Sequence, residues 1–338
     1  MIREAISTVV AGKDLTEAEA AEVMEELMSE AATPSQAAAL LVALRLKGET
    51  VDEITGMVRV MREKVLRVEI DGDVLDVVST GGGSFDPFNI STTAAFVCAG
   101  AGVRVAKHGN RGFTSASGAA DVIEALGAKL ELTPEQTKTC IEQTGFGFLF
   151  AQLLHPAMRF VGPTRREIGI RTIFNSLGPL TNPAGAQYQL LGVGTAEMAE
   201  KVAAVLGRLG VGRALVVHSE DGLDEVSLGA PTIVHELIGT ALKTYTLTPE
   251  DAGFDRIPLS AVRSGNKDEN AARLRDVLAG NKGPDREYTL INAGAALVAA
   301  NKASDIKAGV ALAREAIDSG AAGRVLGAYV TATNSFGS

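Results

Sequence analysis

The residues best suited to chemistry lie in a glycine-rich stretch between a mostly apolar run and a helical pattern. The run from Val74 to Val78 contains β-branched residues and predicts a buried strand. Gly81 to Gly83 follow, and because glycine has no Cβ, their backbone N–H groups can approach a ligand closely. Asn89 to Thr93 then open an apolar run, Ala94 to Ala99, that indicates a helix. A strand, a glycine loop and a helix N-terminus favour phosphate binding, with an ordinary glycine-rich turn as the alternative.

Three further groups of residues could act on the same ligand. Lys107 to Arg111 place cations, a histidine and an amide in an expected loop. Asp224 and Glu225 are adjacent carboxylates in another loop, a pattern suited to Mg²⁺ that keeps part of its water shell. The arginines that could hold a carboxylate in a bidentate fork are Arg165, Arg166 and Arg171. The plainer alternatives are solvated loop charges, a surface turn, a structural ion pair and, for His108, a hydrogen bond to the backbone.

The composition narrows the class of protein. The chain has 338 residues, 46% of them hydrophobic, which is enough for one large or two smaller domains. A net charge of −9, no tryptophan and 4% aromatic residues argue against nucleic acid or an anionic membrane as partner. Cys98 and Cys140 show neither metal-binding nor disulfide spacing. Because no apolar run approaches ~18 residues and the N-terminus does not resemble a signal peptide, we expect a cytoplasmic protein.

The elements that must position these residues follow two patterns. Residues 1–68 are helical throughout, with capping boxes that begin helices at Thr16, Thr33 and Thr50. Their apolar content exceeds what a small bundle can bury, which predicts a dimer face. From Val74 on, strands alternate with helices, which predicts a mostly parallel sheet covered on both faces. The expected fold class is therefore α/β, with a small all-helical domain and a larger α/β domain.

The pattern also predicts where the elements lie. The expected strands are 74–78, 102–106, 146–154, 189–193, 214–218 and 232–236. The expected helices are 16–32, 33–48, one from 50, 94–99, 115–126, 133–144, 163–171, 172–177, 196–209, 267–279, 289–301 and 305–319, and the segment from Ala321 is left open. Ligands gather beyond the carboxyl ends of parallel strands, so the three loops with polar residues can share one cleft.

Several longer segments are similar to one enzyme family. They are Thr80-Gly-Gly82, Phe88-Asn-Ile-Ser-Thr92, Val105-Ala-Lys-His-Gly-Asn-Arg111, Leu177-Gly-Pro-Leu-Thr-Asn-Pro183 and Gly222-Leu-Asp-Glu225. Together they closely resemble the anthranilate phosphoribosyltransferases of tryptophan biosynthesis, in register over nearly the whole chain. The resemblance implies a helical domain, 1–70 joined by 165–187, and an α/β phosphoribosyl-binding domain, 71–164 with 188–338. It also implies a homodimer formed through the helical domain.

The family's reaction fits these residues. The amino group of anthranilate attacks C1 of phosphoribosyl pyrophosphate, giving N-(5-phosphoribosyl)anthranilate and pyrophosphate. An aromatic amine is already a nucleophile, so the resemblance implies no catalytic acid or base. Catalysis would rest on positioning and on neutralising the leaving pyrophosphate with Mg²⁺ and N–H donors.

The resemblance also implies which residues bind. Residues of the glycine loop, the following helix N-terminus and the basic loop would hold phosphoribosyl pyrophosphate: Ser79, Gly81, Gly82, Gly83, Pro87, Asn89, Ile90, Ser91, Thr92, Lys107, His108, Gly109, Asn110, Arg111, Ser115 and Ala119. Anthranilate would contact Ser79, Asn110 and Arg165, the last through its carboxylate. The Mg²⁺ cofactor would be served by Ser91, Asp224 and Glu225.

The chain departs from the family pattern around the diphosphate. The family usually has Asp where this chain has Gly83, Gly where it has Ser84, and Thr where it has Pro87. Ala119 stands where serine is common. Proline removes both a hydroxyl and a backbone donor. We therefore predict an altered affinity for phosphoribosyl pyrophosphate rather than a loss of activity.

Two other functions compete with this interpretation. A pyrimidine nucleoside phosphorylase shares the fold and a Ser-Thr-Gly-Gly motif, but that family has Lys-His before the motif, where this chain has Val77-Val78. That family also has a further C-terminal domain, for which this chain is too short. The second competitor is a non-catalytic relative that binds nucleic acid or a partner protein, which the acidic charge and the intact set of predicted site residues disfavour.

Overall fold

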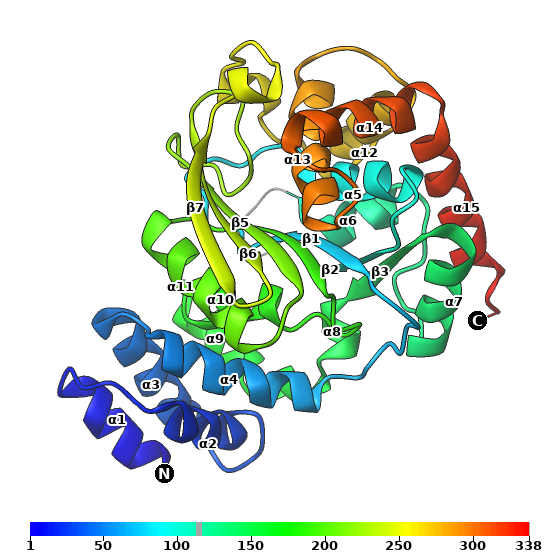
Figure 1. Cartoon of the computed structure of the whole chain (residues 1–338). Helices are drawn as coiled ribbons and strands as arrows, with labels where there is room; N and C mark the ends of the chain where they lie inside the picture. Colours follow the sequence, from blue (N-terminus) through cyan, green and yellow to red (C-terminus); the bar gives the residue numbers. More distant parts are fainter. Residues whose placement is uncertain (113–116, 338) are drawn as a thin grey trace.

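The computed structural model describes residues 1–112 and 117–337. Within these residues the strands form one seven-stranded sheet with the order β3-β2-β1-β4-β5-β6-β7 (Figure 1). They are β1 (Leu75–Ser79), β2 (Val105–Gly109), β3 (Phe146–Phe150), β4 (Tyr188–Gly192), β5 (Arg213–Ser219), β6 (Thr232–Ile238) and β7 (Ala241–Leu247). Neighbouring strands from β3 to β5 are parallel, whereas β6 and β7 are antiparallel to their neighbours. The expected mostly parallel sheet is therefore confirmed.

Helices cover both faces of the sheet, as expected (Figure 1). One face carries α5 (Ile90–Gly100), α6 (Ala119–Ala125), α7 (Pro134–Thr144), α12 (Lys267–Leu278), α13 (Pro284–Ala299), α14 (Ile306–Asp318) and α15 (Ala321–Ser335). The other carries α9 (Gly162–Ile168), α10 (Phe174–Leu177) and α11 (Ala196–Arg208). Because side chains alternate along a strand, Leu190 and Leu215 pack into the first core, and Leu191 and Val216 into the second.

The N-terminal region is helical. It consists of α1 (Ile2–Val10), α2 (Glu17–Leu27), α3 (Pro34–Lys47) and α4 (Val51–Lys64). The capping boxes predicted at Thr16, Thr33 and Thr50 are all present, so these helix starts are confirmed. The core of α1–α4 continues into α11 and into Ile173 and Phe174. This packing supports the predicted return of 165–187 to the helical domain, while the domain boundaries themselves stay a prediction.

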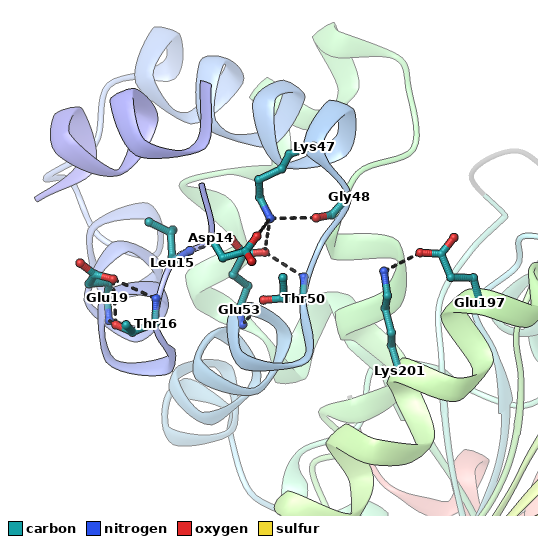
Figure 2. A network of polar contacts seen from close by, with 10 residues as sticks. All are labelled: Asp14, Leu15, Thr16, Glu19, Lys47, Gly48, Thr50, Glu53, Glu197 and Lys201. Atoms are coloured by element: carbon teal, nitrogen blue, oxygen red, sulfur yellow. Dashed lines mark hydrogen bonds and ion pairs between the residues drawn. The ribbon is translucent and has the colours of Figure 1, made fainter. Parts of the chain in front are cut away.

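A polar cluster, here called the helical hub, joins α3 and α4 to the segment before α2 (Figure 2). Its centre is Glu53, whose side chain is fully buried. The carboxylate accepts hydrogen bonds from the Leu15 N–H at 3.0 Å and the Thr50 N–H at 2.9 Å. Lys47 Nζ lies 3.1 Å from the same carboxylate and 2.6 Å from Asp14. The hub therefore satisfies its buried charges within the protein.

The strand expected at 102–106 is wrong in its bounds, with a consequence for the site. The observed strand β2 runs from Val105 to Gly109, so Lys107 and His108 lie inside the sheet rather than in a loop. Lys107 pairs with Phe148 of β3. The charge of Lys107 favoured a loop in the sequence-based prediction. In the structure its ammonium group donates a hydrogen bond to the backbone oxygen of Val77 inside the protein.

Other expected bounds differ for local reasons. The apolar run 146–154 is a strand only to Phe150, and Ala151–Leu154 forms the short helix α8. An apolar run of this length does not by itself separate strand from helix. The edge strand β7 was not expected, because its side chains are mostly polar and exposed. Helix α13 begins at Pro284 instead of 289, since proline is well suited to the first helical position. The segment left open is helix α15.

Candidate active site

A cavity of about 490 Å³ lies beyond the carboxyl ends of β1, β2 and β5. As predicted, the glycine loop, the basic residues of β2 and the acidic loop share it. The predicted site residues that line it are Ser79, Gly81, Gly83, Pro87, Asn89, Ser91, Lys107, His108, Gly109, Asn110, Arg111, Ala119, Asp224 and Glu225. Those outside its lining are Gly82, Ile90, Thr92 and Arg165. Ser115 falls outside the described residues.

The glycine loop docks directly on the acidic loop. The Gly82 N–H donates to Asp224 Oδ2 at 3.1 Å, and the Ser84 N–H donates to Gly222 O at 2.9 Å. A Cβ on Gly83 would lie 2.8 Å from both Asp224 Oδ1 and Gly222 O, closer than real contacts allow. The absence of a side chain at Gly83 therefore permits this approach, and an aspartate there would require the loop to shift.

The N-terminus of α5 lies at the wall of the cavity. Asn89 precedes the helix with φ −70° and ψ 64°, and its side chain makes no capping hydrogen bond. The Ile90 N–H instead donates to Phe88 O at 2.6 Å, which closes an inverse γ-turn. Asn89 and Ser91 both line the cavity. The positive end of a helix that its own N-cap side chain leaves free is suited to an anion.

Two carboxyl groups, those of Asp224 and Glu225, line the cavity beside this helix end. Both are buried, with 5% and 8% of their surfaces exposed. Burial and the neighbouring Asp224 charge raise the pKa of Glu225 to about 8, opposed by Lys107 and by hydrogen bonds from Ser91. Glu225 Oε2 is buried and has no hydrogen-bond partner among the described residues. An orphaned carboxylate oxygen beside a second carboxylate and the Ser91 hydroxyl fits a cation.

Mg²⁺ fits this donor set better than a transition metal would. The residues that the structure describes contain no cluster of three or more His, Cys, Asp or Glu side chains able to hold a metal. Magnesium needs fewer protein ligands, because it keeps several waters and binds through one or two carboxylates together with substrate phosphates.

Lys107 is buried at the floor of the cavity with 2% of its surface exposed. Its Nζ donates to Val77 O at 2.5 Å and lies 3.3 Å from Ser91 Oγ. Burial lowers the pKa of Lys107, and the charges of Asp76 and Glu225 only partly oppose this. Among the described residues no ion pair satisfies this ammonium group. Lys107 is therefore a buried lysine at the cavity and not a solvated loop residue.

His108 and His155 form a buried pair beside Lys107. Their Nε2 atoms are 3.1 Å apart and their ring centres 5.0 Å apart. Burial, the neighbouring imidazole and Lys107 keep the pKa of His108 well below its usual value. Burial alone lowers the pKa of His155 to about 4. Both rings are therefore neutral near pH 7. His108 lies in a strand rather than a turn, but it does make the expected hydrogen bond to the backbone, at Gly178.

The arginines divide into paired and unpaired groups. Arg111 forms ion pairs with Asp121 at 3.1 Å and Glu124 at 3.0 Å, so its charge is already neutralised. Arg165 lies over the Phe174 ring at 4.9 Å, and burial lowers its pKa to about 10. Within the described part of the chain, neither a side-chain hydrogen bond nor an ion pair engages its guanidinium.

Among the cavity-lining residues that were not predicted as ligands, Arg171 and Asn175 come from a segment distant from the predicted loops. Arg171 reaches the glycine loop, where it donates to Thr80 O at 2.9 Å and to Gly81 O. Asn175 lines the same cavity from α10. Arg171 was one of the three arginines considered as carboxylate partners from the sequence. Only the fold shows that Arg171 lines the cavity whereas Arg165 does not. Nothing in its local sequence showed that it would contact the glycine loop.

Comparison with known proteins agrees with this geometry. Family models described as the helical bundle domain and the a/b domain of a glycosyl transferase family match residues 3–65 and 71–323. The anthranilate phosphoribosyltransferase of Chloroflexus aggregans is 55% identical over 323 residues, 95% of either chain. The crystal structure of the Thermus thermophilus enzyme of that name is 48% identical, with a TM-score of 0.92 over 98% of this chain and 99% of that one.

A more distant relative shows the same fold with ligands. The anthranilate phosphoribosyltransferase of Saccharomyces cerevisiae, in complex with phosphoribosyl pyrophosphate (PRPP) and Mg, is 28% identical with a TM-score of 0.91. That match covers 99% of this chain and 98% of the yeast chain. Because the identity, the coverage and the cavity all agree, this chain belongs to the anthranilate phosphoribosyltransferase family.

Proposed function

We propose that this chain transfers the phosphoribosyl group of PRPP to the amino group of anthranilate, as in tryptophan biosynthesis. The observation that carries the proposal is one cavity lined by a helix end that its own N-cap side chain leaves free, a buried lysine and a pair of buried carboxylates. Such a cavity suits a diphosphate together with a divalent cation. Family membership supplies the reaction and the second substrate.

The diphosphate would lie against the glycine loop and the start of α5. Backbone N–H groups there, the Asn89 amide and the Lys107 ammonium group would donate to its oxygens. Ser91, Asp224 and Glu225 would hold Mg²⁺, which neutralises the leaving pyrophosphate when bound. The orphaned Glu225 Oε2 supports this assignment. The roles of the individual residues are proposals.

Anthranilate would contact Asn110, which lines the cavity, and Arg165 of α9, whose side chain lies outside the lining and would have to turn toward the cavity. Arg165 supports the assignment as carboxylate partner, because its guanidinium has no carboxylate within the described residues. In the reaction, the amine nitrogen bonds to C1 of the ribose while the C1–O bond to pyrophosphate breaks, and the nitrogen then loses a proton. The chain's residues orient the two substrates, and no side chain is needed as a nucleophile.

We also propose a homodimer formed through the helical domain. An apolar groove of about 610 Å³ between α1 and α3 is lined by Val10, Val42 and Leu46 among others. Val10 is 71% exposed and Leu46 82% exposed. The same groove of a second protomer would pack against this one and cover both side chains. Sedimentation analysis should show a dimer in the wild type and a monomer in Leu46→Glu, whereas a wild-type monomer would contradict this proposal.

The cellular location remains part of the proposal. Both cysteines, Cys98 and Cys140, are free and buried, as is usual in a reducing compartment such as the cytoplasm. The described residues contain no helix long and apolar enough to cross a membrane.

Anthranilate fluorescence tests the function directly. We expect the fluorescence to fall only when enzyme, PRPP and Mg²⁺ are all present, and to stay constant when a chelator is added. Folded protein that leaves anthranilate unchanged would contradict the proposal. Phosphorolysis of thymidine would then favour a nucleoside phosphorylase, and tight binding of single-stranded DNA without turnover would favour a non-catalytic relative.

A further inference from the structure

A buried asparagine outside the cavity holds one of the residues that line it. Asn270 lies in the first turn of α12 and is fully buried. Its Nδ2 donates to Asn89 Oδ1 at 3.0 Å and to Ser264 Oγ at 2.9 Å. Its Oδ1 accepts a hydrogen bond from the Gly265 N–H at 3.0 Å. The two asparagines are 181 positions apart in the sequence, so this contact exists only in the folded protein.

The direction of these hydrogen bonds is determined by backbone groups at both ends. At one end the Gly265 N–H can only donate, so Asn270 must present its Oδ1 there and its Nδ2 to Asn89. At the other end, Asn89 Nδ2 donates to Ser117 O at 3.2 Å, and a carbonyl can only accept. The Asn89 amide therefore has one orientation, with Oδ1 toward Asn270.

This orientation decides what Asn89 offers to a ligand. Its Oδ1 is occupied by Asn270, and one of its two amide hydrogens is occupied by Ser117 O. The remaining N–H belongs to a side chain that lines the cavity. If the amide turned over, an oxygen would face the ligand and repel a diphosphate. The same contact keeps Asn89 Oδ1 from capping the N–H groups at the start of α5, and Asn89 makes no side-chain capping hydrogen bond there.

The surrounding backbone supports a rigid connection between the two segments. The Phe88 N–H donates to Val262 O at 2.8 Å, and the Ser264 N–H donates to Asp86 O at 2.9 Å. Pro87 and Arg263 form an isolated antiparallel bridge between the same segments. The segment leading into α5 is thus paired with the segment leading into α12, and the Asn270–Asn89 contact extends this pairing to the cavity.

We propose that Asn270 is a positioning residue for diphosphate binding, which it serves by fixing the Asn89 amide with its free N–H toward the cavity. The inference rests on the proposed function, because that function makes the diphosphate of PRPP the ligand of Asn89. Asn270 itself does not line the cavity. It acts only through Asn89.

Binding calorimetry with PRPP and Mg²⁺, together with steady-state kinetics, tests the inference. Asn270→Ala should bind PRPP roughly tenfold more weakly and raise its KM by a similar factor, with kcat within about twofold, as expected for one buried hydrogen bond. Ser264→Ala is the matched control, because it removes the other partner of Asn270 Nδ2 and leaves the bond to Asn89 intact. It should stay within about twofold of the wild type in binding and KM.

The same Asn270 substitution in an Asn89→Ala background separates a positioning role of Asn270 from a general effect on protein stability. In Asn89→Ala, the added Asn270→Ala change should weaken binding by less than about twofold, because the residue through which Asn270 acts is already gone. If Asn270→Ala does not fold, Asn270→Leu takes its place. Leucine keeps about the size of the side chain and is uncharged, but has no N–H to give to Asn89.

Three outcomes would overturn the inference. They are unchanged PRPP binding in the Asn270 variant, equal weakening by Ser264→Ala, and a full tenfold loss that persists in the Asn89→Ala background. Failure of the proposed function is a different result, since the wild type itself would then neither bind PRPP nor consume anthranilate. Normal wild-type turnover with an unaffected Asn270 variant would refute the positioning role alone.

Discussion

The side chain of Lys47 in the helical hub is 7% exposed and Lys107 at the cavity is 2% exposed, yet their surroundings are opposite. Lys47 Nζ lies 2.6 Å from Asp14 and 3.1 Å from Glu53, and it also donates to Gly48 O at 2.9 Å (Figure 2). Burial would lower the pKa of Lys47, but the hydrogen bonds to the two carboxylates raise it overall. Lys107 has a carbonyl and a hydroxyl as its neighbours within hydrogen-bonding distance, and its pKa is lowered.

This difference separates a structural ion pair from a binding group. The hub's charges compensate each other, so the hub needs no ligand. At the cavity the burial of Lys107 and Glu225 is not fully compensated, and one Glu225 oxygen has no partner among the described residues. Such a site can lower its free energy by binding an anion and a cation together. Matched substitutions in the two regions should therefore affect different properties.

The largest effect should come from Lys107→Met. We expect kcat/KM for PRPP to fall by about 10³-fold, because one charged donor to the leaving pyrophosphate is lost. The free energy of unfolding should change much less, since no ion pair of the described chain is broken. Steady-state kinetics and thermal denaturation of the same preparation measure both quantities. A Lys107→Met variant with a much lower free energy of unfolding but wild-type kcat/KM would contradict this prediction.

The matched substitution in the hub is Lys47→Met. It should lower the free energy of unfolding by about 3 kcal/mol, because Glu53 would remain buried without its cation. Urea denaturation measures this change, and kcat/KM at a temperature where the variant is folded should stay near the wild-type value. Unchanged stability would show that the hub does not depend on the ion pair.

Acid should weaken the cavity region through its buried histidines. The pKa of His155 is about 4 when folded, below its usual 6.5, so its neutral form stabilises the fold above pH 6.5 and this contribution is lost as the pH falls toward 4. The loss is on the order of 3 kcal/mol for this group. Denaturation from pH 7 to pH 4 should therefore show a shallower loss in His155→Gln. Equal slopes in the two proteins would contradict buried neutral imidazoles.

The smallest effect should come from restoring the usual family residues in the loop. The variant Gly83→Asp, Ser84→Gly, Pro87→Thr should change the dissociation constant for PRPP by a few-fold, roughly 1 kcal/mol. The physical reason is that a Cβ at Gly83 would lie 2.8 Å from Asp224 Oδ1 and would displace the loop from the acidic residues. Calorimetry with Mg²⁺ and PRPP measures the constant. Identical affinities would show that these departures do not affect the pocket.

Much of the fold could be predicted because its signals are local. The helix capping boxes at Thr16, Thr33 and Thr50 depend on residues three positions apart, and the structure confirms each one. The strand, glycine loop and helix around Gly81 to Gly83 likewise form within one short stretch. The family motifs identified the loops that meet at the cavity, because parallel strands bring their carboxyl ends to one edge of the sheet.

The charge state and partners of the site residues were decided by the tertiary structure. Lys107 is buried because β2 pairs with β3 through Phe148, and Arg111 is neutralised by Asp121 and Glu124. The orientation of the Asn89 amide depends on Asn270, far along the chain. Local sequence shows which side chains are available for binding, but burial and the direction of a hydrogen bond depend on distant segments. The sequence by itself therefore determined the family and the candidate residues, and only the fold decided which of them remain unpaired for a ligand.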